Sequence, residues 1–295
     1  MASSELAPFP VIVGAPRSGT TLLRFMLDSH PELAIPAETG FIPACAGLSG
    51  ADRELRAAFV RLVTTYPPDA PAWEDHGIPI DTFNRELEAL PAFTVSDGLR
   101  TFYRLYATRF GKRRAGDKTP VYARHMGVIA RLLPEARFIH IIRDGRDVAL
   151  SWRKTWFSPG RDIRTLAKAW STWVEDARAE ANLVPHYTEI RFEMLVSQPE
   201  MVLRKIASFI DLPYTPAMLD YPERAAARLA EHGPRVAADG RVLVTRETRL
   251  QQQRRTKGRP DAARAYAWRS ELDDRERTEF ASEAGALLAL LGYEQ

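Results

Sequence analysis

A glycine-bounded loop near the start of the chain carries residues suited to hold a phosphate or sulfate group. Gly14, Gly19 and Thr21 match the P-loop spacing GxxxxGK[ST], between a short apolar run and a segment of helical character. Thr20 occupies the lysine position, and Arg17 lies inside the loop instead. Backbone N–H groups at a helix start and a planar arginine fork both bind anions, so we expect a site for a nucleotide other than ATP or GTP. The alternative is a tight turn in which the glycines serve backbone geometry alone.

A second group of residues follows an apolar run later in the chain. Arg143 comes directly after residues 137–142, and Ser151 lies about two helical turns further on. A P-loop NTPase would place an aspartate here to hold Mg²⁺, whereas an arginine repels a metal ion and attracts a second phosphate. The alternative is that Arg143 pairs with Asp144 or Asp147 at the start of a helix.

Both groups need strands that end side by side. Residues 10–13, 137–142 and 187–192 read as buried strands, and the chain from 40 to 115 reads as a strand-poor helical insertion. Helices are expected over 20–28, 52–66, 81–90, 98–110, 121–133, 145–152, 166–181, 199–210 and 273–292. This alternation predicts an α/β, P-loop-like three-layer fold with a central parallel sheet flanked by helices. Ligands of such sheets bind at the carboxyl ends of the strands.

Length and composition predict a single globular domain over residues 1–295, with 45% hydrophobic and 27% charged residues. A net charge of +3 with interleaved acids and bases gives no reason to expect a nucleic-acid partner. The single cysteine, Cys45, excludes an internal disulfide, and the six histidines lack metal-ligand spacing, so we expect no metal.

The ends of the chain show no targeting or membrane signal. The first ten residues lack a basic start followed by an apolar core, and the apolar stretch 284–291 is too short to span a bilayer. We therefore expect a cytoplasmic protein without a membrane span, and the Ala- and Arg-rich composition points to a bacterial source. The sequence leaves the oligomeric state open, with a homodimer among the alternatives.

In this order and spacing, the two groups resemble the 5′- and 3′-binding motifs of sulfotransferases that use 3′-phosphoadenosine 5′-phosphosulfate (PAPS). The resemblance rests on residues 16–22 (PRSGTTL), 143–147 (RDGRD) and Ser151. Residues 23–39 and 116–120 (GDKTP) are similar to the tyrosylprotein sulfotransferase branch and its bacterial relatives. Further similarity covers 191–195 and 272–294.

The resemblance implies how the donor PAPS, and the product 3′,5′-ADP (PAP), would be bound. The 5′-phosphosulfate would be held by Arg17, Ser18, Gly19, Thr20 and Thr21. Arg143 and Ser151 would hold the 3′-phosphate, and the basic loop Lys257, Gly258 and Arg259 would close over it, with Trp268 further on.

The resemblance also implies a metal-free, in-line displacement. Arg17 and Lys118 would stabilise the charge that builds on the leaving phosphate oxygen, and Glu38 would be the general base. A carboxylate shielded from water has its pKa raised toward the working range, and we expect this of Glu38. His30 and His140 are competing bases, although the first is expected to pack at a helix end and the second in the core.

The acceptor is less defined than the donor. An apolar cleft in the insertion would suit a hydroxyl on a small molecule, lipid, polyketide or glycan. The aromatic residues that either line this cleft or merely pack the helices are Trp73, Phe83, Phe93, Phe102, Tyr103 and Tyr106. Gly40 stands where the tyrosylprotein branch has an arginine, which argues against protein tyrosine, and Phe192 stands where relatives often have a tyrosine.

Two other classes compete with this hypothesis. A P-loop kinase or NTPase would need a loop lysine and a Mg²⁺ site, and Thr20 and Arg143 argue against both. A catalytically silent nucleotide-binding protein would not need Glu38 and Lys118, which are both present.

Overall fold

Four parallel strands form the main sheet of the described residues, in the order β4–β1–β5–β6. The computed structural model describes residues 6–231, 233–237, 239–253, 258 and 265–294. The strands are β1 (Phe9–Val13), β4 (Asp117–Lys118), β5 (Ala136–Ile142) and β6 (Tyr187–Arg191). β1 pairs with β5 from Phe9↔Ala136 to Val13↔His140, so both strands end at one edge of the sheet. The expected fold class, α/β with a central parallel sheet flanked by helices, is confirmed.

Successive apolar side chains of the strands point to opposite faces of the sheet, and both faces are buried. Ile12 and Ile139 pack with α1 (Thr20–Asp28) and α10 (Pro199–Phe209). Val13 and Phe138 belong to the core on the other face, with α6 (Met126–Leu132) and α8 (Ile163–Ala181). The same layers contain α7 (Gly145–Trp152), α9 (Phe192–Ser197), α11 (Tyr221–Ala230), α13 (Trp268–Glu271), α14 (Asp274–Leu290), η2 (Pro120–Arg124) and η3 (Pro216–Met218). Strands buried on both faces explain why β1 and β5 read as continuous apolar runs.

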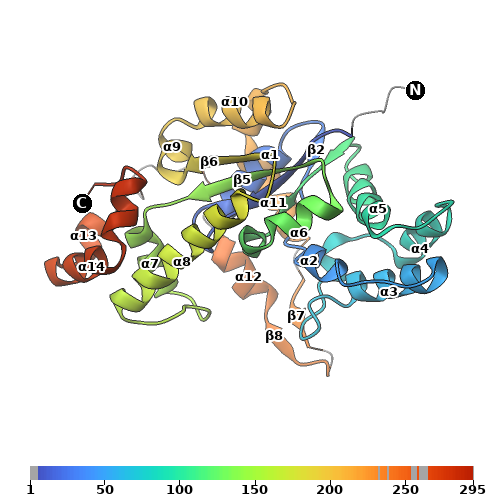
Figure 1. Cartoon of the computed structure of the whole chain (residues 1–295), viewed down its shortest axis with the longest axis horizontal. Helices are drawn as coiled ribbons and strands as arrows, with labels where there is room; N and C mark the ends of the chain where they lie inside the picture. Colours follow the sequence, from blue (N-terminus) through green and yellow to red (C-terminus); the bar gives the residue numbers. More distant parts are fainter. Residues whose placement is uncertain (1–5, 232, 238, 254–257, 259–264, 295) are drawn as a thin grey trace.

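The helical insertion lies between two short paired strands, β2 (Leu33–Ala34) and β3 (Arg114–Ala115). It contains α2 (Ile42–Cys45), α3 (Asp52–Thr64), η1 (Trp73–His76), α4 (Ile80–Glu88) and α5 (Val95–Thr108). Figure 1 shows the insertion at one end of the sheet and α13 and α14 at the other. The helices predicted in this region are confirmed within a few residues.

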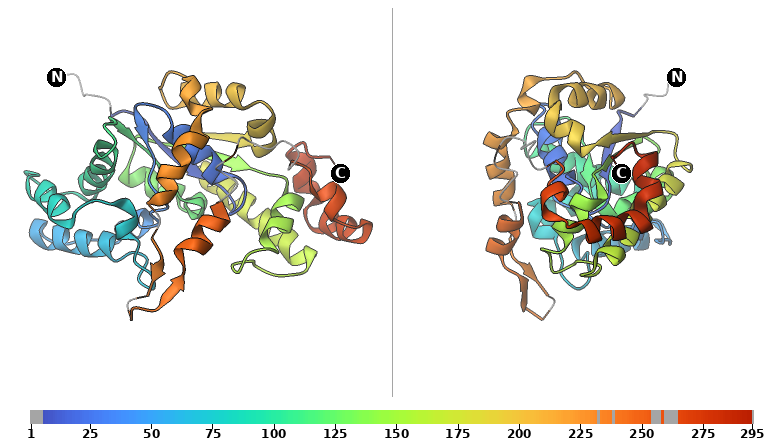
Figure 2. Two further views of the ribbon diagram at one scale, coloured as in Figure 1. Left: turned by 180° about the vertical axis from the view of Figure 1, so that it is seen from behind. Right: turned by 90° about the vertical axis from the view of Figure 1, so that its left-hand side faces the viewer.

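Several features differ from the sequence expectations. The expected helix over 121–133 is two elements, η2 and α6, because His125 between them has φ −142°. Strand β4 was not predicted, since its two polar residues carry no strand pattern. A hairpin of β7 (Arg235–Val236) and β8 (Val242–Val244), followed by α12 (Arg246–Gln253), was also not predicted and projects from the body of the protein (Figure 2).

Gly19 closes the loop before α1 in a conformation and a space that suit glycine alone. Its φ is 102°, and an added Cβ would lie 2.4 Å from Cδ2 of Phe192. We expect Gly19→Ala to lower the free energy of unfolding by about 2 to 4 kcal/mol, because strain and overlap act together. Urea denaturation measures the change. Gly47→Ala is the control, because its nearest atom would be 3.8 Å away; equal losses in both variants would contradict the prediction.

Candidate functional site

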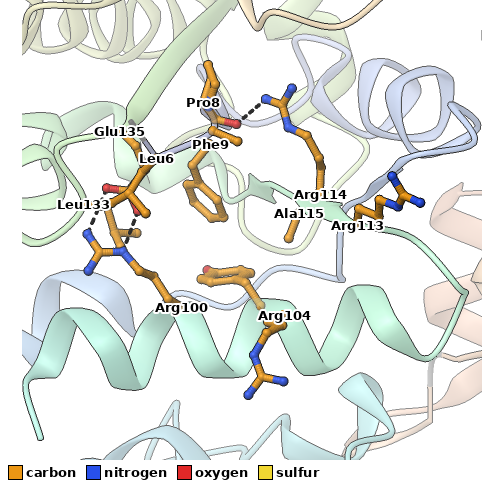
Figure 3. Close-up of a pocket in the computed structure, with 12 residues that line it drawn as sticks. Leu6, Pro8, Phe9, Arg100, Arg104, Arg113, Arg114, Ala115, Leu133 and Glu135 are labelled. Atoms are coloured by element: carbon orange, nitrogen blue, oxygen red, sulfur yellow. Dashed lines mark hydrogen bonds and ion pairs between the residues drawn. The ribbon is translucent and has the colours of Figure 1, made fainter. Parts of the chain in front are cut away.

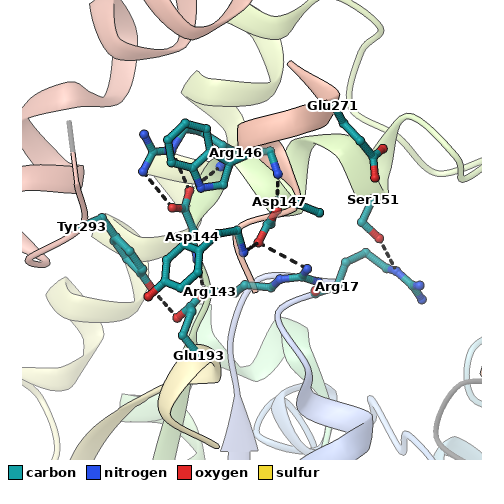
Figure 4. A network of polar contacts seen from close by, with 12 residues as sticks. Arg17, Arg143, Asp144, Arg146, Asp147, Ser151, Glu193, Glu271 and Tyr293 are labelled. Atoms are coloured by element: carbon teal, nitrogen blue, oxygen red, sulfur yellow. Dashed lines mark hydrogen bonds and ion pairs between the residues drawn. The ribbon is translucent and has the colours of Figure 1, made fainter. Parts of the chain in front are cut away.

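The loop between β1 and α1 directs Arg17 toward α7. Arg17 has φ 75°, in the left-handed region that residues other than glycine seldom adopt. The Ser18 N–H donates to the Ala15 carbonyl over 3.1 Å, which tightens the loop. The Arg17 Nε donates to Oγ of Ser151 over 3.0 Å (Figure 4). The structure therefore brings together one residue from each of the two predicted binding motifs.

Arg143 follows β5 and lies beside the same loop. Its guanidinium lies over the ring of Phe192, 4.6 Å from the centroid, and one terminal nitrogen lies 3.5 Å from the Arg17 carbonyl. The other terminal nitrogen is 3.5 Å from Oδ2 of Asp147, so the pairing considered as an alternative is present. Trp170 Nε1 donates to the Arg143 carbonyl over 3.2 Å. These contacts place Arg143 and Arg17 together at the carboxyl edge of the sheet (Figure 4).

Two buried aspartates at the start of α7 attach the C-terminal segment to this cluster. Asp147 accepts hydrogen bonds from the backbone N–H groups of Tyr266 at 2.9 Å and Trp268 at 3.0 Å. Asp144 pairs with Arg146, whose guanidinium lies over the Trp268 ring at 3.4 Å from the centroid. Burial raises the pKa of Asp147, although Arg143 and the two N–H donors oppose the shift.

Glu193 and Tyr293 complete this support, and the sequence analysis assigned neither of them a role. Glu193 Oε1 accepts from the Asp144 N–H over 2.9 Å, and Oε2 accepts from the Tyr293 hydroxyl over 3.0 Å (Figure 4). Burial raises the pKa of Glu193, with the Asp144 N–H acting against it. The available signal was an acidic residue two positions beyond β6, at the edge of the sheet that holds the site.

Glu38 and Lys118 form an ion pair next to the loop. Lys118 lies on β4 in register with Ile12 of β1, and its Nζ contacts Oε1 of Glu38. The Lys118 side chain is 3% exposed and the Glu38 side chain 52% exposed. The carboxylate is therefore accessible to an acceptor, while the ammonium group is enclosed by protein.

Both pKa values of this pair are lowered, but for different reasons. Desolvation acts to raise the pKa of Glu38, but Lys118, with smaller contributions from Arg235 and Arg24, outweighs it. Burial lowers the pKa of Lys118, and the Glu38 carboxylate opposes that shift. The expected upward shift for Glu38 is wrong in this structure, because the ion pair exceeds the effect of desolvation.

Comparison with known proteins identifies the family. A model of the sulfotransferase family matches residues 8–216. The chain belongs to the sulfotransferase family. Protein-tyrosine sulfotransferase A of Caenorhabditis elegans is 26% identical over 75% of the chain and 54% of its own length, so the chain spans about half of that relative. Nodulation protein NoeE of Sinorhizobium fredii is 27% identical, over 99% of the chain and 68% of its own length.

Solved structures show the same sulfotransferase fold. The sulfotransferase domain from the curacin biosynthetic pathway has a TM-score of 0.63 at 19% identity, covering 99% of each chain. The sulfotransferase domain from the Synechococcus PCC 7002 olefin synthase has a TM-score of 0.59 at 20% identity, covering 100% of this chain and 98% of that one. At these identities the likeness concerns the fold.

The histidines considered as bases in this sulfotransferase have other contacts. His30 Nδ1 accepts from the Glu32 N–H over 3.1 Å, and its Nε2 lies 3.0 Å from the Pro213 carbonyl oxygen, which fits the expected packing role. His140 lies in β5 with Nδ1 2.6 Å from the Tyr187 hydroxyl, and burial lowers its pKa to about 4. Both side chains are buried, which leaves Glu38 as the accessible candidate base of the three.

Of the three residues in the basic loop predicted over the 3′-phosphate, the structure describes Gly258. Lys257 and Arg259 lie outside the described residues. Gly258 is exposed, and its carbonyl accepts from the Tyr221 hydroxyl over 2.5 Å. Trp268, further along, is 4% exposed and packs against Arg146.

The aromatic residues of the insertion pack its core. All six proposed for the acceptor wall are 8% exposed or less. Phe102 makes edge contacts with Phe41 and Phe83, at 5.1 and 6.3 Å between ring centroids. The packing alternative therefore describes them.

Asp75 of η1 is a polar residue that joins the insertion to the hairpin. It pairs with Arg235 of β7 at 3.1 Å and with Arg249 of α12 at 2.7 Å. Arg235 in turn acts on the pKa of Glu38, so the hairpin lies within electrostatic reach of the ion pair.

None of the helices that the structure describes is long and apolar enough to cross a membrane.

Proposed function

We propose that this sulfotransferase transfers the sulfuryl group of PAPS to an acceptor hydroxyl. The observation that carries the proposal is the meeting of Arg17, Arg143 and Ser151 at the edge of the sheet where Lys118 pairs with Glu38. Because β4 adjoins β1, Lys118 leaves the sheet beside the start of the loop. Two anion-binding groups and a base–cation pair thus share one edge, as a sulfuryl donor phosphorylated at both ends requires.

The hydrogen-bond donors and cations at this edge of the sheet fit the two charged ends of PAPS. The N–H groups at the start of α1, the hydroxyls of Ser18, Thr20 and Thr21, and Arg17 would hold the 5′-phosphosulfate. Arg143 and Ser151 would hold the 3′-phosphate. The hydrogen bond from Arg17 to Ser151 links the two subsites, so both ends of one nucleotide would be bound by a connected set of side chains.

The ion pair supplies the chemistry of transfer. Glu38 would accept the proton of the acceptor hydroxyl as its oxygen forms a bond to sulfur. The bond between sulfur and the bridging phosphate oxygen breaks, and Lys118 and Arg17 would stabilise the charge left on that oxygen. Since Glu38 and Lys118 already touch, the base and this cation are at the same point of the site.

Thermal unfolding with three nucleotides tests the donor assignment. We expect 3′,5′-ADP at about 100 times its Kd to stabilise the protein by about 2.7 kcal/mol. The same concentration of 5′-ADP should stabilise the protein less, because 5′-ADP has no 3′-phosphate for Arg143 and Ser151 to bind. Arg143→Met should remove most of the difference in stabilisation between 3′,5′-ADP and 5′-ADP. The stabilisation by 5′-ADP itself should remain. Stabilisation by ATP–Mg²⁺ and none by 3′,5′-ADP would contradict the proposal.

The acceptor hydroxyl, we infer, belongs to a small molecule, lipid, polyketide or glycan. Gly40 stands two residues after Glu38 with φ 74°, and an added Cβ would lie 2.7 Å from Cε1 of Tyr66. The backbone conformation at this position therefore favours glycine, and an arginine side chain, which would suit acidic peptides, would overlap Tyr66. Parallel assays with PAPS and either a tyrosine peptide or hydroxylated lipids and glycans distinguish the classes. Transfer to the peptide alone would contradict this inference.

A further inference from the structure

Four buried polar residues connect the segments that carry Glu38 and Lys118. We call Thr39, Tyr103, Asp117 and Tyr122 the buried clamp. Each is 2% exposed or less. Thr39 directly follows Glu38, and Asp117 directly precedes Lys118, so the clamp joins the two catalytic positions from the protein side.

The contacts within the buried clamp form a continuous network. The Thr39 hydroxyl donates to Oδ2 of Asp117 over 2.7 Å, and the Tyr103 hydroxyl donates to the same oxygen over 2.7 Å. The Tyr122 hydroxyl lies 2.8 Å from Oγ1 of Thr39 and accepts from the Ile42 N–H over 3.0 Å. The backbone is tied as well, since the Thr39 N–H donates to Oγ1 of Thr119 over 3.2 Å.

Each member of the network comes from a different element. Thr39 lies in the loop after β2, Asp117 in β4, Tyr122 in η2 and Tyr103 in α5 of the insertion. The Tyr103 ring packs against Phe9 at 4.7 Å between centroids. It also lines a pocket at the amino-terminal edge of the sheet, near the Arg100–Glu135 pair (Figure 3). Tyr103 is thus fixed by the sheet and by the insertion together.

The arrangement of β4 makes the buried clamp act on the ion pair. Successive residues of a strand direct their side chains to opposite faces, so fixing Asp117 inward directs Lys118 to the other side. Hydrogen bonds in a dry interior are strong and directional, and a buried carboxylate that loses a donor is costly. The segment holding Glu38 is therefore bound to β4 by short side-chain hydrogen bonds in addition to the ion pair.

We propose that the buried clamp positions Glu38 and Lys118 for sulfuryl transfer, with Thr39 and Asp117 as its central positioning residues. This inference rests on the proposed function. It gives the inner hydrogen bonds a catalytic role that the ion pair alone cannot fill, because the Glu38 side chain is half exposed and, within the described residues, hydrogen-bonds through its carboxylate to Lys118 alone.

Thr39→Val and Thr39→Ser separate positioning from a general effect on folding. Valine keeps the shape and removes the hydroxyl, whereas serine keeps the hydroxyl. We expect Thr39→Val to lower the affinity for PAPS by about tenfold, through loss of a buried hydrogen bond. The rate at which bound PAPS passes its sulfuryl group to water, giving sulfate and 3′,5′-ADP, should also fall by about tenfold. The Kd for 3′,5′-ADP, which lacks the sulfuryl group, should stay within about twofold, and Thr39→Ser should restore most of both losses.

Calorimetry with PAPS and 3′,5′-ADP, together with single-turnover release of radiolabelled sulfate, gives these readouts. Tyr103→Phe removes the second donor to Asp117 and should reproduce the selective loss if Thr39→Val folds poorly. Unchanged PAPS affinity and rate in folded Thr39→Val and Tyr103→Phe would overturn the inference, as would an equal loss of 3′,5′-ADP binding. A wild-type protein that binds neither nucleotide would instead refute the proposed function.

Discussion

Replacing Glu38 by glutamine should reduce sulfuryl transfer by about 10² to 10⁴ while leaving the Kd for 3′,5′-ADP nearly unchanged. Glutamine has the same shape and can still accept a hydrogen bond from Lys118, but it cannot take a proton from the acceptor. The carboxylate is exposed enough to meet an acceptor, and its contact with Lys118 places it beside the group that would assist the leaving phosphate. The measurement is initial-rate transfer from PAPS, with calorimetry of 3′,5′-ADP on the same preparations.

Glu200→Gln is a matched control, because Glu200 forms an exposed ion pair with Arg204 on α10. That variant should keep its turnover. The ion pair with Lys118 also sets the pH dependence: Glu38 is deprotonated above a pKa held below its ordinary value of 4.5. On the acid side, the wild-type rate should therefore stay constant down to about pH 4.5 and fall below it, as the base becomes protonated. Full turnover in Glu38→Gln would remove Glu38 as the base.

Lys118→Met should lower the rate of the transfer step by about 10² to 10³, because it removes a fixed cation from the point where charge develops. Methionine fills the enclosed space without leaving a buried charge. Binding of 3′,5′-ADP should change much less, since its phosphates are assigned to the loop, Arg143 and Ser151. Without the ammonium group, the pKa of Glu38 should also return toward its ordinary range. Single-turnover transfer from bound PAPS isolates the step.

Lys112→Met distinguishes this effect from the loss of any buried lysine. Lys112 donates to the carbonyls of Leu33 and Asp28, and burial lowers its pKa to about 8. Its replacement should reduce stability, because two carbonyl groups lose their donor, and should leave turnover per folded molecule unchanged. If both lysine variants lost stability and kept turnover, Lys118 would be structural.

The sequence allowed the meeting of the two candidate anion-binding motifs to be predicted because their signals are local. An apolar run ending at Gly14 and another ending at Arg143 are each recognisable alone, and parallel strands necessarily place their ends at one edge. Helix α1 was predicted at Thr20–Asp28 because the glycine turn begins it and His30-Pro31 follows it. For Glu38 and Lys118 the resemblance implied two separate roles, and their pairing came from the structure alone.

The remaining features depend on partners far along the chain. Strand β4 exists because Asp117 and Lys118 pair with β1, and nothing in those two polar residues indicates a strand. The β7–β8 hairpin is joined to Asp75 through Arg235 and Arg249, more than 150 residues away. Such ion pairs leave no periodic pattern in the sequence. For the aromatic residues of the insertion, a signal was present but ambiguous, because a hydrophobic core and an apolar cleft are built from the same residue types.

The attachment of Asp144 and Asp147 to the C-terminal segment has a consequence for biosynthesis. Every residue assigned to the phosphosulfate and to catalysis lies within the first 151 positions, so a ribosome has made them when about half the chain has emerged. The groups that fix Asp147 and the support of Asp144 are Tyr266, Trp268 and Tyr293. A nascent chain that stops before residue 265 would carry the residues assigned to the donor without these contacts to Asp147 and Glu193. Donor binding is therefore expected to depend on the docking of the C-terminal segment against α7.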